Sequence, residues 1–219
     1  MSDATAAPTG FRLPTPDVIP AVRRFDDAVD RAFEHVRGRE PSDRILYAIS
    51  ELGDFGLIWL FIGAAKSVRS DRNFDRGARL FAVMAAESVL MNGFVKGLFQ
   101  RERPTHTEER PHKLRIPKTT SFPSGHSSSA FLASALLAEE NPRLAPAYYG
   151  LAVVVSASRV HVRIHHASDV ISGVAAGALL GVIAKRLWPL DGEPAIVAPL
   201  WRTASSGARR NARRRRRVH

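Results

Sequence analysis

A histidine and an aspartate stand four residues apart at His165 and Asp169, a spacing that suits a nucleophile and its orienting partner. On a helix, this spacing brings the carboxylate to one ring nitrogen of the imidazole. The carboxylate would fix the tautomer, leave the other nitrogen free to attack, and stabilise the cation that forms. His166 is a rival, because residues three apart on a helix are also neighbours. Helix geometry alone therefore leaves both histidines as candidates.

A second polar group opens an apolar stretch at residues 122–126, which read Phe-Pro-Ser-Gly-His. Ser124 suits the N-cap of a helix, and Gly125 would let a ligand approach the backbone closely. Free N–H groups and a partial positive charge make such a helix start an anion site. His126 could there protonate a leaving alkoxide. An ordinary capped helix start explains the same residues equally well.

Three basic residues form the third signal, namely Lys96, Arg103 and Arg159. Lys96 and Arg103 lie seven residues apart, close to two helical turns, so they share a face where an apolar segment ends. Pro104 then ends that helix. Arginine suits two phosphate oxygens at once, whereas lysine supplies a point charge. Taken singly, basic residues at helix ends usually serve as snorkelling anchors.

Five apolar segments must position these side chains. They cover residues 45–67, 77–99, 125–140, 144–161 and 166–187. A membrane span needs about 20 mostly apolar residues, a length that the first two segments and the last one reach. The last segment is rich in glycine and alanine, which favours close helix packing in lipid. We therefore predict an all-α membrane helical bundle of about five transmembrane helices; hydropathy alone leaves a soluble bundle as the alternative.

An N-terminal amphipathic helix is predicted ahead of the bundle. Apolar residues recur at steps of three and four between Asp17 and Val36, opposite a charged face. This helix is too charged to span a bilayer, so it should lie in the interface or pack on the helices that follow. We divide the chain into a disordered N-terminus (1–17), the amphipathic helix with a linker (18–44), a catalytic membrane domain (45–188) and an Arg-rich disordered tail (189–219).

The three signals together resemble the three-part signature of the type 2 phosphatidic acid phosphatase (PAP2) family. The matching parts are Lys96-x6-Arg103-Pro104, Pro123-Ser124-Gly125-His126 and Ser158-Arg159-x5-His165-x3-Asp169. No signature position departs from the family pattern. The spacing from Arg159 through the histidine to Asp169 selects His165 over His166.

This resemblance implies a role for each signature residue. Five of them would hold the phosphoryl oxygens: Lys96, Arg103, Ser124, Gly125 and Arg159. His165 would attack phosphorus to give a phosphohistidine, His126 would donate a proton to the departing oxygen, and Asp169 would orient His165. The family needs no metal and no other cofactor, because the cations stabilise the developing charge.

The implied activity is a metal-independent phosphatase that acts on a lipid phosphate or diphosphate. Plausible substrates are a polyprenyl (for example undecaprenyl) diphosphate, phosphatidic acid and phosphatidylglycerophosphate. One alternative is a vanadate-dependent haloperoxidase-like enzyme, whose site the signature resembles. Another is a catalytically idle membrane protein that binds anionic lipid or nucleic acid through its basic tail. The oligomeric state stays open.

The charge balance points to an anionic partner. The 219 residues include 32 Lys and Arg against 21 Asp and Glu, a net charge of +11, and no cysteine, which excludes disulfides and thiolate metal sites. Residues 209–219 contain seven arginines. We expect this tail to anchor on an anionic lipid surface, and we disfavour nucleic acid because no aromatic residues are interleaved with the arginines.

Membrane topology puts every chemical signal on one side of a bacterial plasma membrane. Helix count places the N-terminus, segment 100–124 and the turn at 159–166 on that side. Lys and Arg number sixteen on each side, and setting aside the three catalytic cations leans the basic tail toward the cytoplasm, with the active site facing outward.

Four further residues invite interpretation. Glu87, inside a predicted span, is either functional or a buried structural partner. Asp54 lies nearer a helix end, where a structural role is favoured. His161 and Arg163 could widen the phosphate site for a diphosphate, although an interfacial position is favoured for both.

Overall fold

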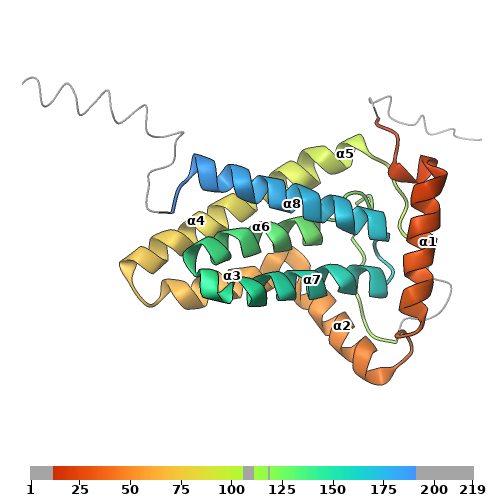
Figure 1. The fold of residues 1–219 in the computed structure, drawn as a ribbon, viewed down its shortest axis with the longest axis horizontal. Coiled ribbons are helices and arrows are strands. Elements are labelled where there is room, and N and C mark those ends of the chain that lie inside the picture. The colour runs from red at the N-terminus through yellow and green to blue at the C-terminus, as the bar shows by residue number, and fades with distance from the viewer. Residues whose placement is uncertain (1–11, 106–110, 118, 191–219) are drawn as a thin grey trace, which may run out of the picture.

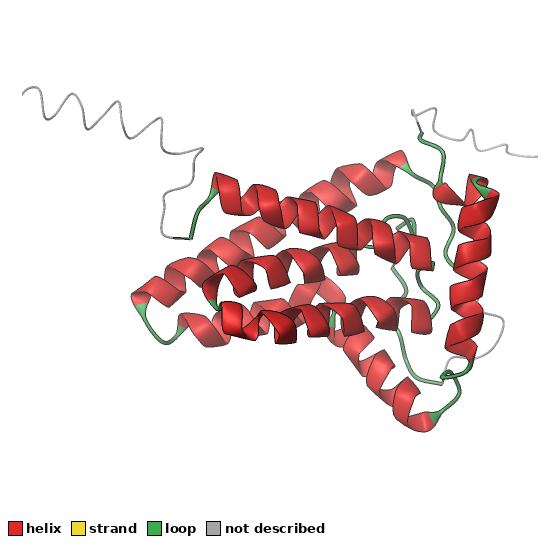
Figure 2. Ribbon diagram, in the orientation of Figure 1, coloured by secondary structure: helices red, strands yellow, loops and turns green. Residues whose placement is uncertain are grey.

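The computed structural model describes residues 12–105, 111–117 and 119–190. Within these ranges every regular element is helical (Figures 1 and 2). The helices are α1 (Pro20–Glu34), α2 (Glu40–Leu52), α3 (Leu57–Ser67), α4 (Asp71–Ser88), α5 (Lys96–Leu98), α6 (Gly125–Glu140), α7 (Ala145–His161) and α8 (Ala167–Leu187). Short 3-10 turns lie at Pro16–Val18, Asp54–Gly56 and Pro142–Leu144, and a π-helical segment, Val89–Val95, joins α4 to α5. The predicted all-α architecture is confirmed.

Two of these helices are long and apolar enough to cross a membrane. One runs from Asp71 to Leu98 and the other is α8. A third span exists if α2 and α3, which are bent by 66° against each other, count as one. Helices α6 and α7 have 16 and 17 residues. Helix α6 packs against α4, α7 and α8, so its neighbours cover most of its surface.

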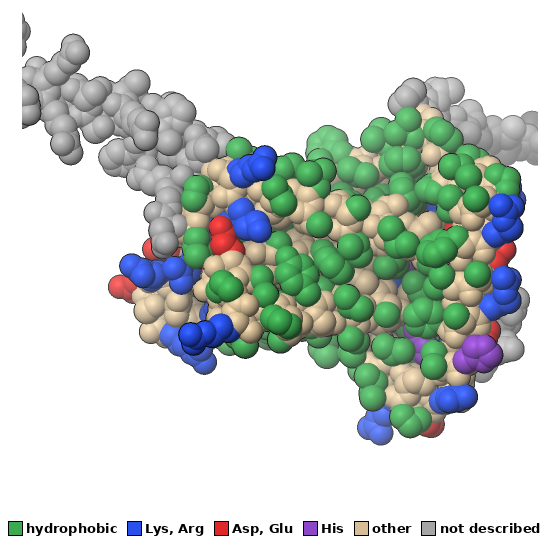
Figure 3. All heavy atoms as spheres, in the orientation of Figure 1, with side chains coloured by type: hydrophobic (Ala, Val, Ile, Leu, Met, Phe, Trp, Pro, Cys, Tyr) green, Lys and Arg blue, Asp and Glu red, His purple; other side chains and the backbone are tan. Residues whose placement is uncertain are grey.

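The bundle presents an apolar surface between two charged ends, as the space-filling view shows (Figure 3). Large hydrophobic side chains are exposed on the long helices, among them Val89, Phe94, Val153, Ile171 and Leu179. Such a band would be costly in water, whereas lipid tails cover it without penalty. The protein is therefore an integral membrane protein.

Helices α6 and α8 approach each other so closely that only glycine fits at their contact. A Cβ atom on Gly173 would lie 2.3 Å from the carbonyl oxygen of Ser124, and one on Gly177 would lie 2.1 Å from that of Ser128. Gly181 meets Ala135 in the same way. The glycine-rich segment therefore forms the predicted small-residue contact in lipid.

The first apolar segment departs from its predicted form, because residues 45–67 do not make one continuous helix. Gly56 adopts a left-handed φ of 69°, which breaks the segment into α2 and α3. The 3-10 turn between the helices carries Asp54, which is buried there. The break thus places the carboxylate of Asp54 in the protein interior, near the middle of the apolar segment.

The amphipathic helix is present as α1 and lies across one end of the bundle (Figure 1). The segment before α1 also contacts the bundle, since the backbone N–H of Leu13 donates to the carbonyl oxygen of Leu98 over 2.8 Å. Residues 12–17, which we assigned to a disordered N-terminus, are therefore placed against the protein. The rest of that segment and almost all of the Arg-rich tail lie outside the described residues.

The α6–α8 contact predicts opposite effects for two glycine substitutions. Gly177→Ala should destabilise the protein by about 1–3 kcal/mol because the added methyl group forces the helices apart. Gly150→Ala on α7, where nothing lies within 4 Å of the new Cβ, should instead stabilise by up to about 1 kcal/mol through helix propensity. Thermal unfolding in detergent, followed by circular dichroism, measures both. Equal melting temperatures for the two variants would contradict the close contact.

Candidate active site

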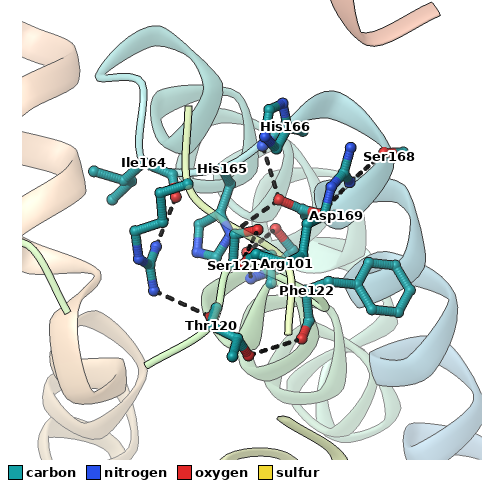
Figure 4. Close-up of polar contacts among 12 residues, drawn as sticks. Arg101, Thr120, Ser121, Phe122, Ile164, His165, His166, Ser168 and Asp169 are labelled. Carbon is teal, nitrogen blue, oxygen red and sulfur yellow. Dashed lines mark hydrogen bonds and ion pairs between the residues drawn. The ribbon is translucent and has the colours of Figure 1, made fainter. Parts of the chain in front are cut away.

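His165 and Asp169 face each other at the start of α8. Their Nδ1 and Oδ2 atoms are 3.6 Å apart, and both side chains are fully buried (Figure 4). The i, i+4 spacing predicts a pair along one face of a helix. His165 instead precedes α8, so the pair forms across the start of that helix. His166 is the N-cap residue, and it is its backbone N–H that donates to Asp169 Oδ2, over 2.8 Å. The structure therefore turns the ring of His165 toward Asp169.

Burial sets the protonation state of His165. Removal from solvent lowers its pKa from 6.5 to about 3, against the opposing pull of Asp169. Neither ring nitrogen has a hydrogen-bond partner among the described residues. With Nδ1 directed at the carboxylate, a neutral imidazole keeps Nε2 available as a nucleophile.

The second histidine, His126, pairs with Asp54. His126 Nε2 lies 2.7 Å from Asp54 Oδ1, and Arg159 Nη2 is 3.5 Å from the same oxygen. Arg159 also donates over 2.6 Å to both the carbonyl and the hydroxyl oxygen of Ser50. The sequence favoured a structural role for Asp54 and did not predict its contact with His126. The sequence signal that could have indicated this contact is the position of Asp54 between Gly53 and Gly56 in an apolar segment.

Lys96 and Arg103 hold the loop that precedes α6. Lys96 Nζ donates to Thr119 Oγ1 over 3.3 Å. Arg103 donates to the carbonyl oxygens of Thr119 and Thr120, and its Nη1 reaches that of Ile164 over 2.6 Å. Arg103 thus ties this loop to the backbone beside His165.

Ser124 and Gly125 open α6 as predicted. Ser124 is the N-cap residue, and its Oγ accepts from Ser127 N over 3.4 Å. Its own N–H donates to the carbonyl oxygen of Asp169 over 3.0 Å, which fixes the start of α6 against the start of α8. A Cβ on Gly125 would stand 4.0 Å from Lys96 Nζ, so the two positions adjoin. All eight predicted site residues therefore belong to one connected set of contacts.

A cavity of about 540 Å³ adjoins this set. Three predicted site residues line it, namely Lys96, Gly125 and His126, together with Asp54, Glu87, Asn92, Arg115 and Thr119. His165 and Arg159 are fully buried and are not among the residues that line it. Glu87 is buried as well, and its Oε1 atom has no hydrogen-bond partner within the described part of the chain.

His161 and Arg163 turn away from the cavity and contact the N-terminal helices. His161 Nε2 lies 2.7 Å from Asp43 Oδ1 on α2. Arg163, whose φ is 53°, contacts Asp30 over 3.2 Å and also Glu34, both on α1. These two residues therefore bind α1 and α2 to the turn between α7 and α8, and neither of them lines the cavity.

Arg101 is a buried residue of the site that sequence reasoning missed. Its Nη1 donates over 2.5 Å to Asp169 Oδ1, on the far side of the carboxylate from His165 (Figure 4). Its Nη2 donates over 2.6 Å to Asp26 of α1. Arg101 lies between two signature cations but holds no signature position, so only the tertiary contacts reveal it.

Comparisons with known proteins agree with this site. The family model of the PAP2 superfamily matches residues 76–192, and the chain belongs to that family. A decaprenylphosphoryl-5-phosphoribose phosphatase of Mycobacterium tuberculosis is 32% identical over 139 residues, which are 62% of this chain and 74% of that protein. A lipid A 1-phosphatase of Rhizobium johnstonii is 33% identical over 112 residues, covering 49% of this chain and 46% of the relative.

Two solved membrane proteins share the fold. A PAP2-type phosphatidylglycerolphosphate phosphatase from Bacillus subtilis aligns with a TM-score of 0.59 and 26% identity, over 77% of this chain and 86% of its own. Aquifex aeolicus LpxE aligns with a TM-score of 0.60 and 21% identity, over 73% and 93%. The protein is thus a PAP2-family phosphatase, which argues against the haloperoxidase alternative.

The buried His165 predicts a specific dependence of stability on pH. Because its pKa is lower in the folded protein, the unfolded chain binds the proton more readily, and stability is lost as the pH falls below 6.5. Between pH 6.5 and 5 the loss attributable to this histidine should reach about 2 kcal/mol. His165→Gln should therefore flatten the decline of the melting temperature over this interval. Parallel curves for the variant and the unmodified protein would contradict a buried neutral histidine.

Proposed function

We propose that this protein hydrolyses a lipid phosphate or diphosphate through a phosphohistidine on His165. The observation that carries the proposal is the unequal pairing of the cations at this site. Arg159 and Arg101 are buried and have carboxylate partners, whereas the buried Lys96 and the half-buried Arg103 make no ion pair with any described side chain. Buried charge without a counterion is costly, and a phosphoryl dianion bound here would supply one.

The first chemical step follows from the two histidines. Nε2 of neutral His165 attacks phosphorus; the N–P bond forms while the bond from phosphorus to the leaving oxygen breaks. His126 donates a proton to that oxygen, and the Asp54 carboxylate, 2.7 Å from His126 Nε2, partly offsets the cost of the buried imidazolium that donates it. Asp169 stabilises the positive charge that develops on His165.

The second step returns the enzyme to its starting state. His126, now neutral, takes a proton from a water molecule that attacks the phosphohistidine. The N–P bond breaks, inorganic phosphate departs, and His165 is again neutral. Lys96, Arg103 and Arg159 would stabilise the phosphoryl oxygens in both steps, with the backbone N–H groups at Ser124 and Gly125 adding helix-start donors.

The membrane setting and the relatives support a lipid phosphate as the class of substrate. The named relatives act on phosphate groups carried by lipids. We place polyprenyl diphosphates, phosphatidic acid, phosphatidylglycerophosphate and sugar-linked lipid phosphates among the candidates. The apolar band around the bundle supports delivery of such substrates from the bilayer. We further propose that the protein lies in a bacterial plasma membrane with this site facing outward and the basic tail on the cytoplasmic leaflet.

The mechanism predicts that the two adjacent histidines differ sharply. His165→Ala should lower phosphate release from a lipid panel in detergent by about 10⁴-fold or more, because it removes the nucleophile. His166→Ala is a matched control, since the N-cap contact to Asp169 uses the backbone N–H of His166 and survives the substitution. This control should retain most of the activity.

EDTA should leave the activity of the unmodified protein unchanged, because the proposed charge stabilisation comes from side chains. Activity that vanished with EDTA would overturn the metal-independent mechanism. Substantial turnover by His165→Ala would overturn the assignment of the nucleophile.

Glu87 predicts selectivity for leaving groups that carry hydroxyls. Its carboxylate lines the same cavity as Lys96 and His126 and could accept hydrogen bonds from a glycerol or sugar hydroxyl. Glu87→Gln should lower kcat/KM for phosphatidylglycerophosphate by about tenfold, in line with the loss of a hydrogen bond to a charged group. Phosphatidic acid, whose leaving diacylglycerol has no other free hydroxyl, should be turned over as before. An equal loss on both substrates would assign Glu87 a structural role.

A further inference from the structure

Helix α1 reaches the catalytic end of the bundle through a buried carboxylate. Asp26 is 5% exposed, although it lies on a helix whose other residues are mostly at the surface. Its neighbour Asp27 is exposed. A carboxylate is rarely buried to this degree unless several donors satisfy it, so its contacts indicate what it serves.

Asp26 makes three hydrogen bonds, all to groups that surround Asp169. Its Oδ1 accepts from Ser168 N over 2.7 Å, which caps the first turn of α8 from outside that helix. Its Oδ2 accepts from Ser168 Oγ over 2.8 Å and from Arg101 Nη2 over 2.6 Å. Helix α1 is thus joined directly to the residue before Asp169.

Arg101 continues the same chain of contacts to the nucleophile. Its Nη1 donates to Ser168 Oγ over 2.7 Å and to Asp169 Oδ1 over 2.5 Å. The other oxygen of Asp169 faces His165 Nδ1 at 3.6 Å. One guanidinium therefore bridges two carboxylates in the protein interior, and the second of them faces the imidazole.

We propose that Asp26 and Arg101 are positioning residues that fix Asp169, and through it His165, so that helix α1 forms part of the catalytic centre. This inference rests on the proposed function, because it assumes that His165 is the nucleophile. Asp26 and Asp169 both accept hydrogen bonds from the guanidinium of Arg101. Because Asp26 holds one side of the guanidinium, Arg101 attracts the Asp169 carboxylate away from His165 less strongly. Without Asp26, Arg101 would keep only the more distant and partly exposed Asp17, at 3.6 Å from its Nε, beside Asp169, and the Asp169 carboxylate would turn from the imidazole.

Charge-neutral substitution of Asp26 tests this arrangement against a matched control. Asp26→Asn should lower kcat by about 10- to 100-fold, the effect expected when a reacting group is misplaced by about 1 Å. KM should stay nearly constant, because the phosphate-binding cations are untouched. Asp27→Asn removes the same charge one position along the helix and should leave kcat unchanged. Asp26→Glu, which restores the carboxylate, should recover a large part of the loss.

The measurement uses the lipid phosphate that the unmodified full-length protein turns over fastest in detergent micelles. Rapid-quench experiments with the labelled substrate give the amplitude and the rate of phosphohistidine formation. The amplitude counts folded sites, so the rate per site is independent of any loss of folded protein. A merely structural role would reduce the amplitude and leave the rate unchanged, which would overturn the proposal.

Ser168→Ala provides a second, milder variant. It removes the hydroxyl that contacts both Asp26 and Arg101 but keeps the backbone N–H that Asp26 caps. A several-fold slower rate of phosphohistidine formation is expected, and an unchanged rate would count against the proposal even if Asp26→Asn yielded no folded protein. Absence of any phosphohistidine in the unmodified protein would instead refute the proposed function itself.

Discussion

Buried charge is the constraint on which this structure depends. A phosphate site needs several cations close together, yet each cation loses its hydration when helices enclose it. The protein meets this conflict with carboxylates brought from distant parts of the chain. Asp54 pairs with Arg159 and His126, while Asp26 and Asp169 share Arg101. The cations left without such partners among the described residues, Lys96 and Arg103, face the loop before α6.

Close helix packing sets the distances over which these charges interact. The glycines of α8 bring its backbone against α6, and the N–H of Ser124 bonds the carbonyl of Asp169 at the point where both helices begin. The capped start of α6 and the His165–Asp169 pair are therefore held by one rigid contact. A larger residue at Gly173 would meet the Ser124 carbonyl itself. Lipid-adapted packing and site geometry thus have a common origin in the small residues of α8.

The parts that could be predicted from the sequence are those encoded locally. The last four apolar segments are helical near their predicted limits, because hydrophobic content and length act within each segment. The signature residues also converge on one side of the bundle as expected. The helical face predicted for Lys96 and Arg103 is wrong, however, because the helix ends at Leu98 and Arg103 lies in the loop beyond it. The break at Gly56 was missed because glycine is tolerated in membrane helices, so its left-handed conformation depends on the surrounding packing. The contacts of Asp26, Asp54 and Arg101 were not predicted for a related reason. Each of these residues binds a partner at least 68 residues away along the chain.

The position of α1 follows from the same electrostatic constraint. The helix has too many charges to enter the bilayer, and its acidic residues Asp26 and Asp30 turn toward Arg101 and Arg163. Hydrophobic burial alone would have turned the apolar face inward, yet Ile19 and Phe25 stay exposed. Polar contacts therefore help to set how α1 is rotated about its axis; Phe25 stays exposed for the membrane interface, whereas Val22, Val29 and Phe33 are partly buried. A single helix can in this way pair with the buried Arg101 and the partly exposed Arg163 on one face and meet lipid on another, which a transmembrane segment with two apolar sides could not do.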